Sequence, residues 1–312
     1  MVIGSIVIPA HNEEGVLGRL LTLLAPQDAQ TRDGVEFDVV VVANGCTDNT
    51  ADVARRMAGP LGVRVLELGE GSKQRALNLG DTATDAFPRL YLDADVELTR
   101  RAAIATLCAL GEPGALAGRP PFVYVTEGGD RWVRAFYRAR SRTPALNGAL
   151  WGAGCYGVSS LGRQRWSVFP SDEPDDRFVD EQFAPGEAAI VPTDPIRVHV
   201  PLTRAALLHT LGRVYAQRPI NPGPAPRRGG SASTLAHVAR AHLAPSRWPD
   251  LLAYVALAVA GRRARNPRNA SPVWTRDETS RQSRQSPPGS LARRAPNSAT
   301  TPPPRSEAES DQ

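Results

Sequence analysis

The chain has 312 residues, a hydrophobic content of 41% and a formal net charge of +5. This length suits one large domain with extensions or two domains, and the apolar content is ample for a sizeable core. Much of the arginine excess lies in the last third, so the charge does not indicate a nucleic-acid partner. The cysteines are odd in number, far apart and without metal-binding spacing, which favours a reducing compartment: Cys46, Cys108 and Cys155.

Residues 1–217 are predicted to form one compact unit in which short β-branched strands alternate with helices. This order predicts an α/β fold with a mainly parallel sheet, right-handed crossovers and flanking helices. In chain order, the expected elements of the first half are strands at Ile3–Ile8, Asp38–Val42, Val63–Leu68 and Arg89–Leu92, and helices at Glu13–Leu24, from Thr47 or Asp48 to Met57, Gln74–Thr82 and Arg100–Leu110.

The chain is less regular after residue 110. The pattern predicts a helix at Asp130–Arg142, a strand at Cys155–Val158, a short helix at Asp175–Gln182, a strand at Ile196–Val200 and a helix at Thr203–Gln217. Residues 218–233 are rich in Pro and Gly and are predicted to be a linker. Residues 234–265 are predicted to be a helical segment, with helices at Leu235–Leu243 and Asp250–Arg265 that dock back. Residues 266–312 have few large apolar side chains, so we expect a disordered tail that is dispensable for catalysis.

Two features bear on cellular location. No secretory signal precedes the first predicted strand, and the longest apolar run, Leu251–Ala260, has half of the roughly 20 residues that a membrane span needs. We therefore expect a cytoplasmic protein. The arginine-rich stretch Gly261–Arg268 supports a further hypothesis, a weak peripheral contact with anionic lipid at the inner face of the membrane.

A polar loop follows each of the first four predicted strands. The carboxyl ends of parallel strands meet at one edge of a sheet, where ligands bind, so these loops should converge. None of them is a glycine-rich dinucleotide or P-loop motif, which argues against those two kinds of site. The loops are Pro9-Ala10-His11-Asn12-Glu13-Glu14, Ala43-Asn44-Gly45-Cys46-Thr47-Asp48, Gly69-Glu70-Gly71-Ser72-Lys73 and Asp93-Ala94-Asp95.

The fourth loop carries two carboxylates that can bind a metal ion. Asp93 and Asp95 are at positions i and i+2, which point to the same side of an extended segment. Two hard oxygen ligands suit Mg²⁺ or Mn²⁺, with diphosphate and water completing the coordination shell. The alternative is a pair of solvated turn aspartates, since an isolated Asp-x-Asp is common.

Lys73 is the only lysine among 37 lysine and arginine residues. The chain uses arginine at every other one of these 37 positions. The one retained lysine therefore indicates a place where a compact ammonium group is preferred to the planar guanidinium group of arginine. The alternative is that this lysine has no special role.

Taken in order, these motifs resemble the bacterial, soluble or peripheral family 2 glycosyltransferases of the GT-A fold, over roughly residues 3–215. The first two loops look like the family's nucleotide-binding motifs, and Gly71-Ser72-Lys73 with Ala76, Leu77 and Asn78 is similar to its Gly-Lys-x-x-Ala-Leu-Asn stretch. Asp93-Ala94-Asp95 matches its metal-binding Asp-x-Asp, and Asp175-Asp176 looks like the acidic pair that carries its catalytic base.

The resemblance implies an inverting, metal-dependent transfer of a sugar from a nucleotide-diphosphate sugar to an acceptor hydroxyl on a glycan, a lipid-linked molecule or a small molecule. It implies that Asp176 is the general base, with Asp175 capping the short helix and Asp180 and Glu181 as reserve candidates. The implied metal ligands for Mn²⁺ or Mg²⁺ are Asp93, Asp95 and His199. The implied donor-binding residues are Pro9, Ala10, His11, Glu13, Asn44, Asp48, Lys73, Asp93, Ala94, Asp95 and Arg213.

Several of these residues have an ordinary structural explanation as well. Asp48 suits a helix cap, His199 a structural strand histidine, Arg213 a solvated helix face, and the acidic pair a favourable charge at a helix N-terminus. The segment Trp151-Gly152-Ala153-Gly154 offers glycines and a flat apolar ring that would shape an acceptor pocket.

The chain also departs from the family pattern. Ala43-Asn44 replaces the family's usual acidic pair, which leaves the nucleotide base open, and the Gln-x-x-Arg-Trp signature of processive synthases is absent. Two other functions are kept open: a sugar nucleotidyltransferase, which normally carries a glycine-rich basic loop after its first strand, and a non-catalytic scaffold with the same fold.

Overall fold

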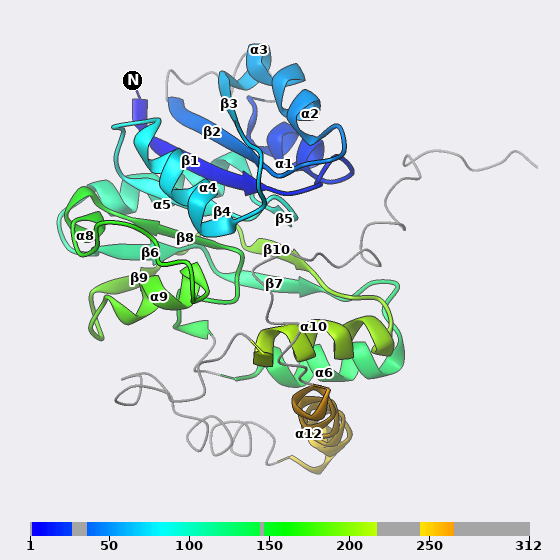
Figure 1. Cartoon of the computed structure of the whole chain (residues 1–312). Coiled ribbons are helices and arrows are strands. Elements are labelled where there is room, and N and C mark those ends of the chain that lie inside the picture. Colours follow the sequence, from blue (N-terminus) through cyan, green and yellow to red (C-terminus); the bar gives the residue numbers. More distant parts are fainter. Residues whose placement is uncertain (1, 27–35, 144–146, 217–243, 265–312) are drawn as a thin grey trace, which may run out of the picture.

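The computed structural model describes residues 2–26, 36–143, 147–216 and 244–264. Its centre is a seven-stranded sheet with the strand order β3-β2-β1-β4-β8-β6-β9, shown in Figure 1. Strands β3, β2, β1 and β4 are parallel, and β8 runs antiparallel to both β4 and β6. This confirms the predicted α/β fold with a mainly parallel sheet. The strands are β1 (Val2–Ala10), β2 (Glu36–Asn44), β3 (Val63–Leu68), β4 (Arg89–Leu92), β6 (Ala117–Arg119), β8 (Cys155–Val158) and β9 (Ala188–Ile190).

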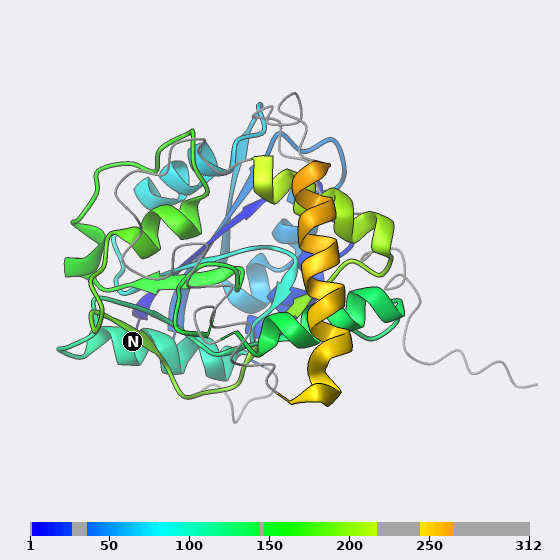
Figure 2. The same ribbon diagram turned by 90° about the horizontal axis from the view of Figure 1, so that it is seen from below.

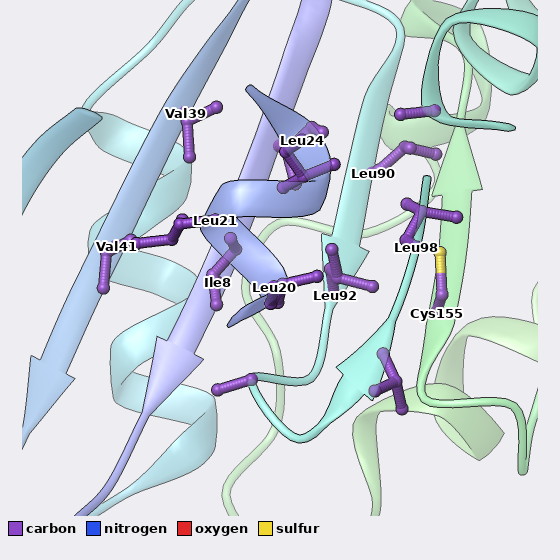
Figure 3. Packing of buried hydrophobic residues seen from close by; sticks show 14 of the residues in the cluster. Ile8, Leu20, Leu21, Leu24, Val39, Val41, Leu90, Leu92, Leu98 and Cys155 are labelled. Atoms are coloured by element: carbon purple, nitrogen blue, oxygen red, sulfur yellow. The ribbon is translucent and has the colours of Figure 1, made fainter. Parts of the chain in front are cut away.

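Helices cover both faces of the parallel strands because the side chains of a buried strand alternate between two apolar layers. Ile6 and Ile8 of β1 pack on one face with α1 (Leu17–Leu24) and α5 (Arg100–Gly111). Figure 3 shows Leu20, Leu21 and Leu24 of α1 lying over Ile8, Val39 and Val41. Val7 points to the other face, where it packs with Leu77 of α4 (Lys73–Thr82). Two short helices follow β2: α2 (Thr50–Arg56) and α3 (Ala58–Leu61).

The close approach of α4 to β1 requires a glycine. A Cβ atom on Gly80 would lie 2.3 Å from Cγ1 of Val7, which is shorter than any tolerated contact. Gly80 therefore lets the helix that begins at Lys73 lie directly on the strand that carries the first polar loop. This packing sets the position of Lys73 relative to the carboxyl end of the sheet.

The second half of the chain adds a small sheet and a layer of three helices. The small sheet has the order β5-β10-β7, formed by β5 (Val96–Glu97), β10 (Ile196–His199) and β7 (Phe122–Val125). The helices α6 (Arg131–Ser141), α10 (Arg204–Ala216) and α12 (Trp248–Arg263) share one apolar cluster, and Figure 2 shows α12 crossing the other two. The remaining elements are α8 (Ser160–Arg163), α9 (Asp175–Glu181) and the 3-10 turn Pro245–Arg247. Among the described residues, no helix combines the length and apolar character needed to cross a membrane.

Most predicted elements appear with boundaries close to those expected, and β3, β4 and β8 match residue for residue. The helix predicted from Glu13 begins only at Leu17, because Asn12 adopts a left-handed conformation (φ 54°) and the Glu13 amide donates to Thr50 Oγ1 at 2.7 Å. The predicted docking of a C-terminal helix is seen in α12. The predicted linker (218–233), the helix Leu235–Leu243 and the tail (266–312) lie outside the described residues.

An acidic side chain fastens α12 to α6. The buried carboxylate of Asp250 accepts hydrogen bonds from Arg138 Nη2 at 2.7 Å and from Arg142 Nη1 at 2.9 Å. Hydrogen bonds from Arg138 lower the pKa of Asp250, and burial opposes this effect. The hydrogen bond from Arg142 and the positive charges of both arginines lower the pKa further. Beside this contact, the ring of Tyr254 stacks on Phe136 with centroids 5.0 Å apart. Charge and aromatic packing together dock the helix.

Replacing Asp250 with Asn should lower the free energy of unfolding by about 1 kcal/mol, since both arginines are partly exposed and water screens the pair. A lowered folded-state pKa contributes stability above the unfolded-state pKa of about 4, and this contribution is lost as the pH falls through the folded-state value. Urea unfolding at neutral and acidic pH measures both effects. Asp172→Asn, which removes an exposed carboxylate, is the control, and an equal loss in the two variants would contradict the docking role.

Candidate active site

The only lysine of the chain lies among carboxylates from two distant segments. Lys73 is the first residue of α4, whose N-cap Ser72 accepts from the Arg75 amide. Its Nζ lies 2.7 Å from Asp93 Oδ1 and 2.9 Å from Asp175 Oδ1. The loop after β3, the turn after β4 and the start of α9 therefore meet at one ammonium group. We call Lys73, Asp93, Asp175 and Asp176 the lysine–carboxylate cluster.

Asp175 is a buried member of this cluster, with 4% of its surface exposed. Its Oδ2 accepts a hydrogen bond from the Tyr156 hydroxyl at 2.8 Å, while Oδ1 binds Lys73. The expectation that Asp175 caps α9 is wrong: Pro174 occupies the N-cap position and no side chain caps the helix. Asp175 is used instead to hold the lysine against β8.

Asp176 and Asp180 hold the segment that was expected to shape the acceptor pocket. Asp176 Oδ2 accepts from the Gly152 amide at 2.8 Å, and one helical turn later Asp180 Oδ1 accepts from the Leu150 amide at 2.8 Å. Gly152 has φ 80°, a backbone conformation that glycine adopts without strain. The candidate base is thus fixed to the loop beside it. Asp180 is buried and serves the same loop, and Glu181 pairs with Arg177 on the helix surface.

Burial and charge shift the pKa values in this cluster. Burial raises the pKa of Asp176, and the neighbouring Asp175 raises it further against the opposing Lys73 charge. The pKa of Asp93 is raised by burial and lowered in part by Lys73. Burial acts to lower the pKa of Lys73, but Asp175 and Asp93 outweigh it, so Lys73 stays charged. A carboxylate with a raised pKa is a stronger base, which suits proton abstraction.

The Asp-x-Asp motif forms a turn between β4 and β5, which corrects the expectation of an extended segment. Asp93 faces Lys73, Ala94 is buried, and Asp95 is exposed, yet the charge of Asp95 still raises the pKa of Asp93. Two neighbouring carboxylates fit a hard divalent cation whose other ligands come from a bound diphosphate and water. Within the described segments, no group of three or more His, Cys, Asp and Glu side chains is arranged to hold a metal ion.

His199 is engaged elsewhere. Its Nε2 pairs with Glu97 Oε1, and Glu97 also lies 3.2 Å from Arg19 Nη2 and 3.4 Å from Arg197 Nε. Glu97 thus pairs with His199 and Arg197 of the small sheet and with Arg19 of α1. This gives His199 a structural partner, while its role as a third metal ligand stays a prediction. Arg213 lies in the last turn of α10.

The first two loops bind each other through hydrogen bonds. His11 Nδ1 lies 2.6 Å from the Asn44 carbonyl oxygen, and Asn44 Oδ1 accepts from the Ser72 amide at 2.8 Å. Asp48 accepts from the amides of Thr50 and Glu14, so it links both loops. The expectation that Thr47 or Asp48 caps the following helix is wrong, because Asn49 occupies the N-cap position of α2 and no side chain caps this helix. Asn44 is fully buried, and its Nδ2 finds no hydrogen-bond partner among the described residues. Glu13 is buried beside Thr50, while Pro9 lines the cavity next to Lys73.

That cavity is small and partly open to solvent. Its volume is about 10 Å³, close to the space of one water molecule. It is lined by Pro9, Lys73, Leu77, Tyr91, Leu92, Asp93, Gly154, Tyr156, Asp175 and Asp176. A sugar ring does not fit inside this cavity, so a ligand of that size would bind at its open side or displace the side chains that line it.

Sequence reasoning missed two side chains at this site. Tyr156 was read only as part of a strand, and its hydroxyl proves to hold Asp175. Arg140 of α6 donates from Nε to the Tyr124 hydroxyl at 2.9 Å, and its Nη2 is 3.8 Å from where a Cβ on Gly152 would lie. The sequence gives no signal that singles out Arg140, because nearly all basic residues of this chain are arginines.

The geometry around Lys73 predicts that arginine cannot replace it. Lys73→Arg keeps the charge but needs more room than a cavity of about 10 Å³ provides, so stability should fall by about 1–3 kcal/mol, the usual range for overpacking. Denaturant unfolding measures this loss. The control is Arg75→Lys, a charge-preserving exchange at an exposed position of the same helix. Wild-type stability of Lys73→Arg would show that any cation suffices.

Residues 5–167, more than half of the chain, match the family model described as glycosyl transferase family 2. A 4,4'-diaponeurosporenoate glycosyltransferase from Staphylococcus aureus is 36% identical over 123 residues, which cover 37% of this chain and 31% of that protein. The matched region thus spans about a third of this curated relative.

A solved structure supports the fold. The mannosyltransferase PcManGT from Pyrobaculum calidifontis, in complex with GDP-Man and Mn²⁺, has a TM-score of 0.53 at 22% identity, over 82% of this chain and 74% of that chain. TarS 1–349 from S. aureus has a TM-score of 0.48 at 16% identity, over 83% and 81% of the two chains. With the GT-A-like sheet and the family match over more than half of its length, this chain belongs to glycosyl transferase family 2.

Proposed function

We propose that this protein is an inverting, metal-dependent glycosyltransferase that moves a sugar from a nucleotide-diphosphate sugar to an acceptor hydroxyl, with Asp176 as the general base. The observation that carries this proposal is the lysine–carboxylate cluster. It brings the Asp-x-Asp turn, on the donor side, next to the acidic pair of α9, on the acceptor side. A single displacement at the anomeric carbon of the sugar needs a group that stabilises the leaving diphosphate on one side of that carbon and a base for the acceptor hydroxyl on the other.

The donor side of the proposed site consists of Asp93, Asp95 and the loops after β1 and β2. A divalent cation bound there would stabilise the negative charge that grows on the leaving diphosphate. PcManGT is described as a complex with GDP-Man and Mn²⁺, which supports a donor and a cation of this kind here. Lys73 neutralises Asp93 and keeps it oriented. Asn44 and His11 order the loops that would hold the base and ribose.

The acceptor side depends on Asp176. The Gly152 amide fixes one of its oxygens, so the carboxylate faces the loop from Trp151 to Gly154. In the proposed step, the acceptor hydroxyl oxygen forms the new bond to the anomeric carbon as its proton passes to Asp176. The bond from that carbon to the diphosphate oxygen breaks, and its electron pair leaves with the diphosphate. A single displacement inverts the configuration.

The two other candidate functions have less support. A sugar nucleotidyltransferase needs a basic, glycine-rich loop after β1, where this chain has His11-Asn12-Glu13-Glu14. A scaffold without activity would not need Asp176 held beside an ordered loop. Release of pyrophosphate from a nucleoside triphosphate and a sugar phosphate would favour the nucleotidyltransferase. We propose action in the cytoplasm, since Cys46, Cys108 and Cys155 are all free.

Donor binding should require both a divalent cation and Asp95. Nucleoside diphosphates with Mn²⁺ should raise the melting temperature of the wild-type chain, because a ligand that binds only the native state stabilises it. Asp95→Ala should lose this shift without a change in intrinsic stability, since Asp95 is exposed. A thermal-shift panel of guanosine, uridine, adenosine, cytidine and thymidine diphosphates tests this, with EDTA as a control. A shift that persists in EDTA would contradict the metal role.

Asp176→Asn should lower the rate of sugar transfer by roughly 10²–10⁴-fold, the usual contribution of general-base catalysis. The amide keeps an oxygen that can accept from Gly152 but cannot take up the proton. Nucleotide binding should persist, because Asp176 touches the acceptor and not the nucleotide. The rate is measured with the donor found in the thermal-shift panel.

Asp180→Asn and Glu181→Gln are the matched controls on the same helix. Both should keep more activity than Asp176→Asn once the folded fraction of each variant is taken into account. Normal transfer by Asp176→Asn, together with loss of transfer in one of these variants, would move the base to that neighbour.

A further inference from the structure

The helix α12 exposes a continuous apolar stripe. Its inner face, which includes Leu257, packs on α6 and α10, and a Cβ atom on Gly261 would lie only 2.6 Å from Leu211 Cβ. Its outer face carries four large apolar side chains, of which Leu252 is 68% and Trp248 57% exposed. Their spacing of four, three and four residues places them on one side of the helix over about 16 Å. We call Trp248, Leu252, Val255 and Val259 the outer stripe.

The helices around the outer stripe are strongly basic. The spans of α6, α10 and α12 together contain eight arginines and one acidic residue, Asp250. Asp250 is buried under Arg138 and Arg142, so it does not face outward. These helices carry a formal charge of +7, whereas the whole chain carries +5, so all other residues together sum to −2. The layer formed by these three helices is therefore strongly positive, and most of its arginines are exposed: Arg131, Arg134, Arg138, Arg204, Arg262 and Arg263.

We infer that the outer stripe docks the protein on the surface of an anionic lipid bilayer. The apolar side chains enter the boundary between headgroups and acyl chains, while the arginines around them bind the headgroups. Trp248 at one end and Arg262 and Arg263 at the other are the residue types that settle at such an interface. The helix lies in the plane of the membrane, with its inner face still packed on α6 and α10.

Charge argues against two other occupants. A second copy of the chain would bring two surfaces of the same positive sign together, and like charges oppose association. Residues 217–243 could reach the stripe along the chain, but their sequence holds four arginines and no acidic residue, so they offer no complementary charge. A surface rich in negative charge, with an apolar layer beneath it, fits both properties of this face.

The docking surface is linked to the proposed site through one helix. Phe136 of α6 stacks on Tyr254 of α12, and Arg140 of the same α6 lies beside Gly152, which binds Asp176. Docking would thus hold the acceptor loop close to the membrane surface, where a lipid-linked acceptor is presented. This consequence for the acceptor depends on the proposed function, whereas membrane docking itself does not.

Vesicle co-sedimentation of the full chain tests the docking, with phosphatidylcholine alone and with phosphatidylcholine mixed with phosphatidylglycerol. The wild-type chain should bind the mixed vesicles more tightly, and added salt should weaken binding. Leu252→Glu should lower the partition coefficient by about tenfold or more, because it puts a charge into the apolar layer. The matched control is Leu161→Glu on α8, where a leucine is 67% exposed on another part of the surface; it should bind as the wild type does.

Three results would overturn the inference: no binding by the wild-type chain, equal binding by Leu252→Glu, or an equal loss in Leu161→Glu. A wild-type dimer that Leu252→Glu converts to a monomer, seen by light scattering without vesicles, would assign the stripe to self-association instead. If Leu252→Glu fails to fold, the double variant Arg262→Gln and Arg263→Gln replaces it, with about a tenfold weaker binding expected. Nucleotide binding that persists when vesicle binding is absent would leave the proposed function standing.

Discussion

The arrangement of this site depends on one partly buried ion-pair network, the ammonium group of Lys73 among the carboxylates of Asp93 and Asp175. The network joins the start of α4, the turn after β4 and the start of α9, which lie far apart in the sequence. Without the ammonium, Asp93, Asp175 and Asp176 would repel one another in a largely buried space. Because Lys73 and Asp93 are partly exposed, removing one of them should cost less than the roughly 3–5 kcal/mol that is typical of a fully buried pair.

The same network leaves little space between Lys73 and the carboxylates. Lys73 lies between Asp93 and Asp175, and the cavity beside them has room for about one water molecule. The surrounding glycines make the packing tight: a Cβ on Gly154 would lie 2.5 Å from Val96 Cγ1. A cation bound to Asp93 would therefore compete with Lys73 for that carboxylate. The raised pKa of Asp176 comes from burial and from the neighbouring Asp175, so the crowding around Lys73 also makes this carboxylate more basic.

The sequence predicted well what depends on local pattern. The alternation of apolar strands and helices predicted the sheet. The rule that ligands bind at the carboxyl ends of strands predicted that the loops of His11, Asn44, Lys73 and Asp93 lie close together. The sequence did not predict contacts between side chains of distant, irregular segments. Nothing near Asp175 in the sequence indicates that it binds Lys73 and Tyr156, and His199 could be assigned to Glu97 only after β5 and β10 were seen to pair. The turn at Asp93–Asp95 was missed because strand periodicity was extended beyond the end of β4.

Crystals soaked with Mn²⁺ and a nucleoside diphosphate, with data collected near the manganese absorption edge, test the central claim most directly. The account predicts an anomalous peak within coordination distance of Asp95, with the diphosphate as a shared ligand and Lys73 moved from its contact with Asp93. Manganese bound at Glu97 and His199, or a nucleotide bound away from the loops of His11 and Asn44, would contradict the proposed donor site.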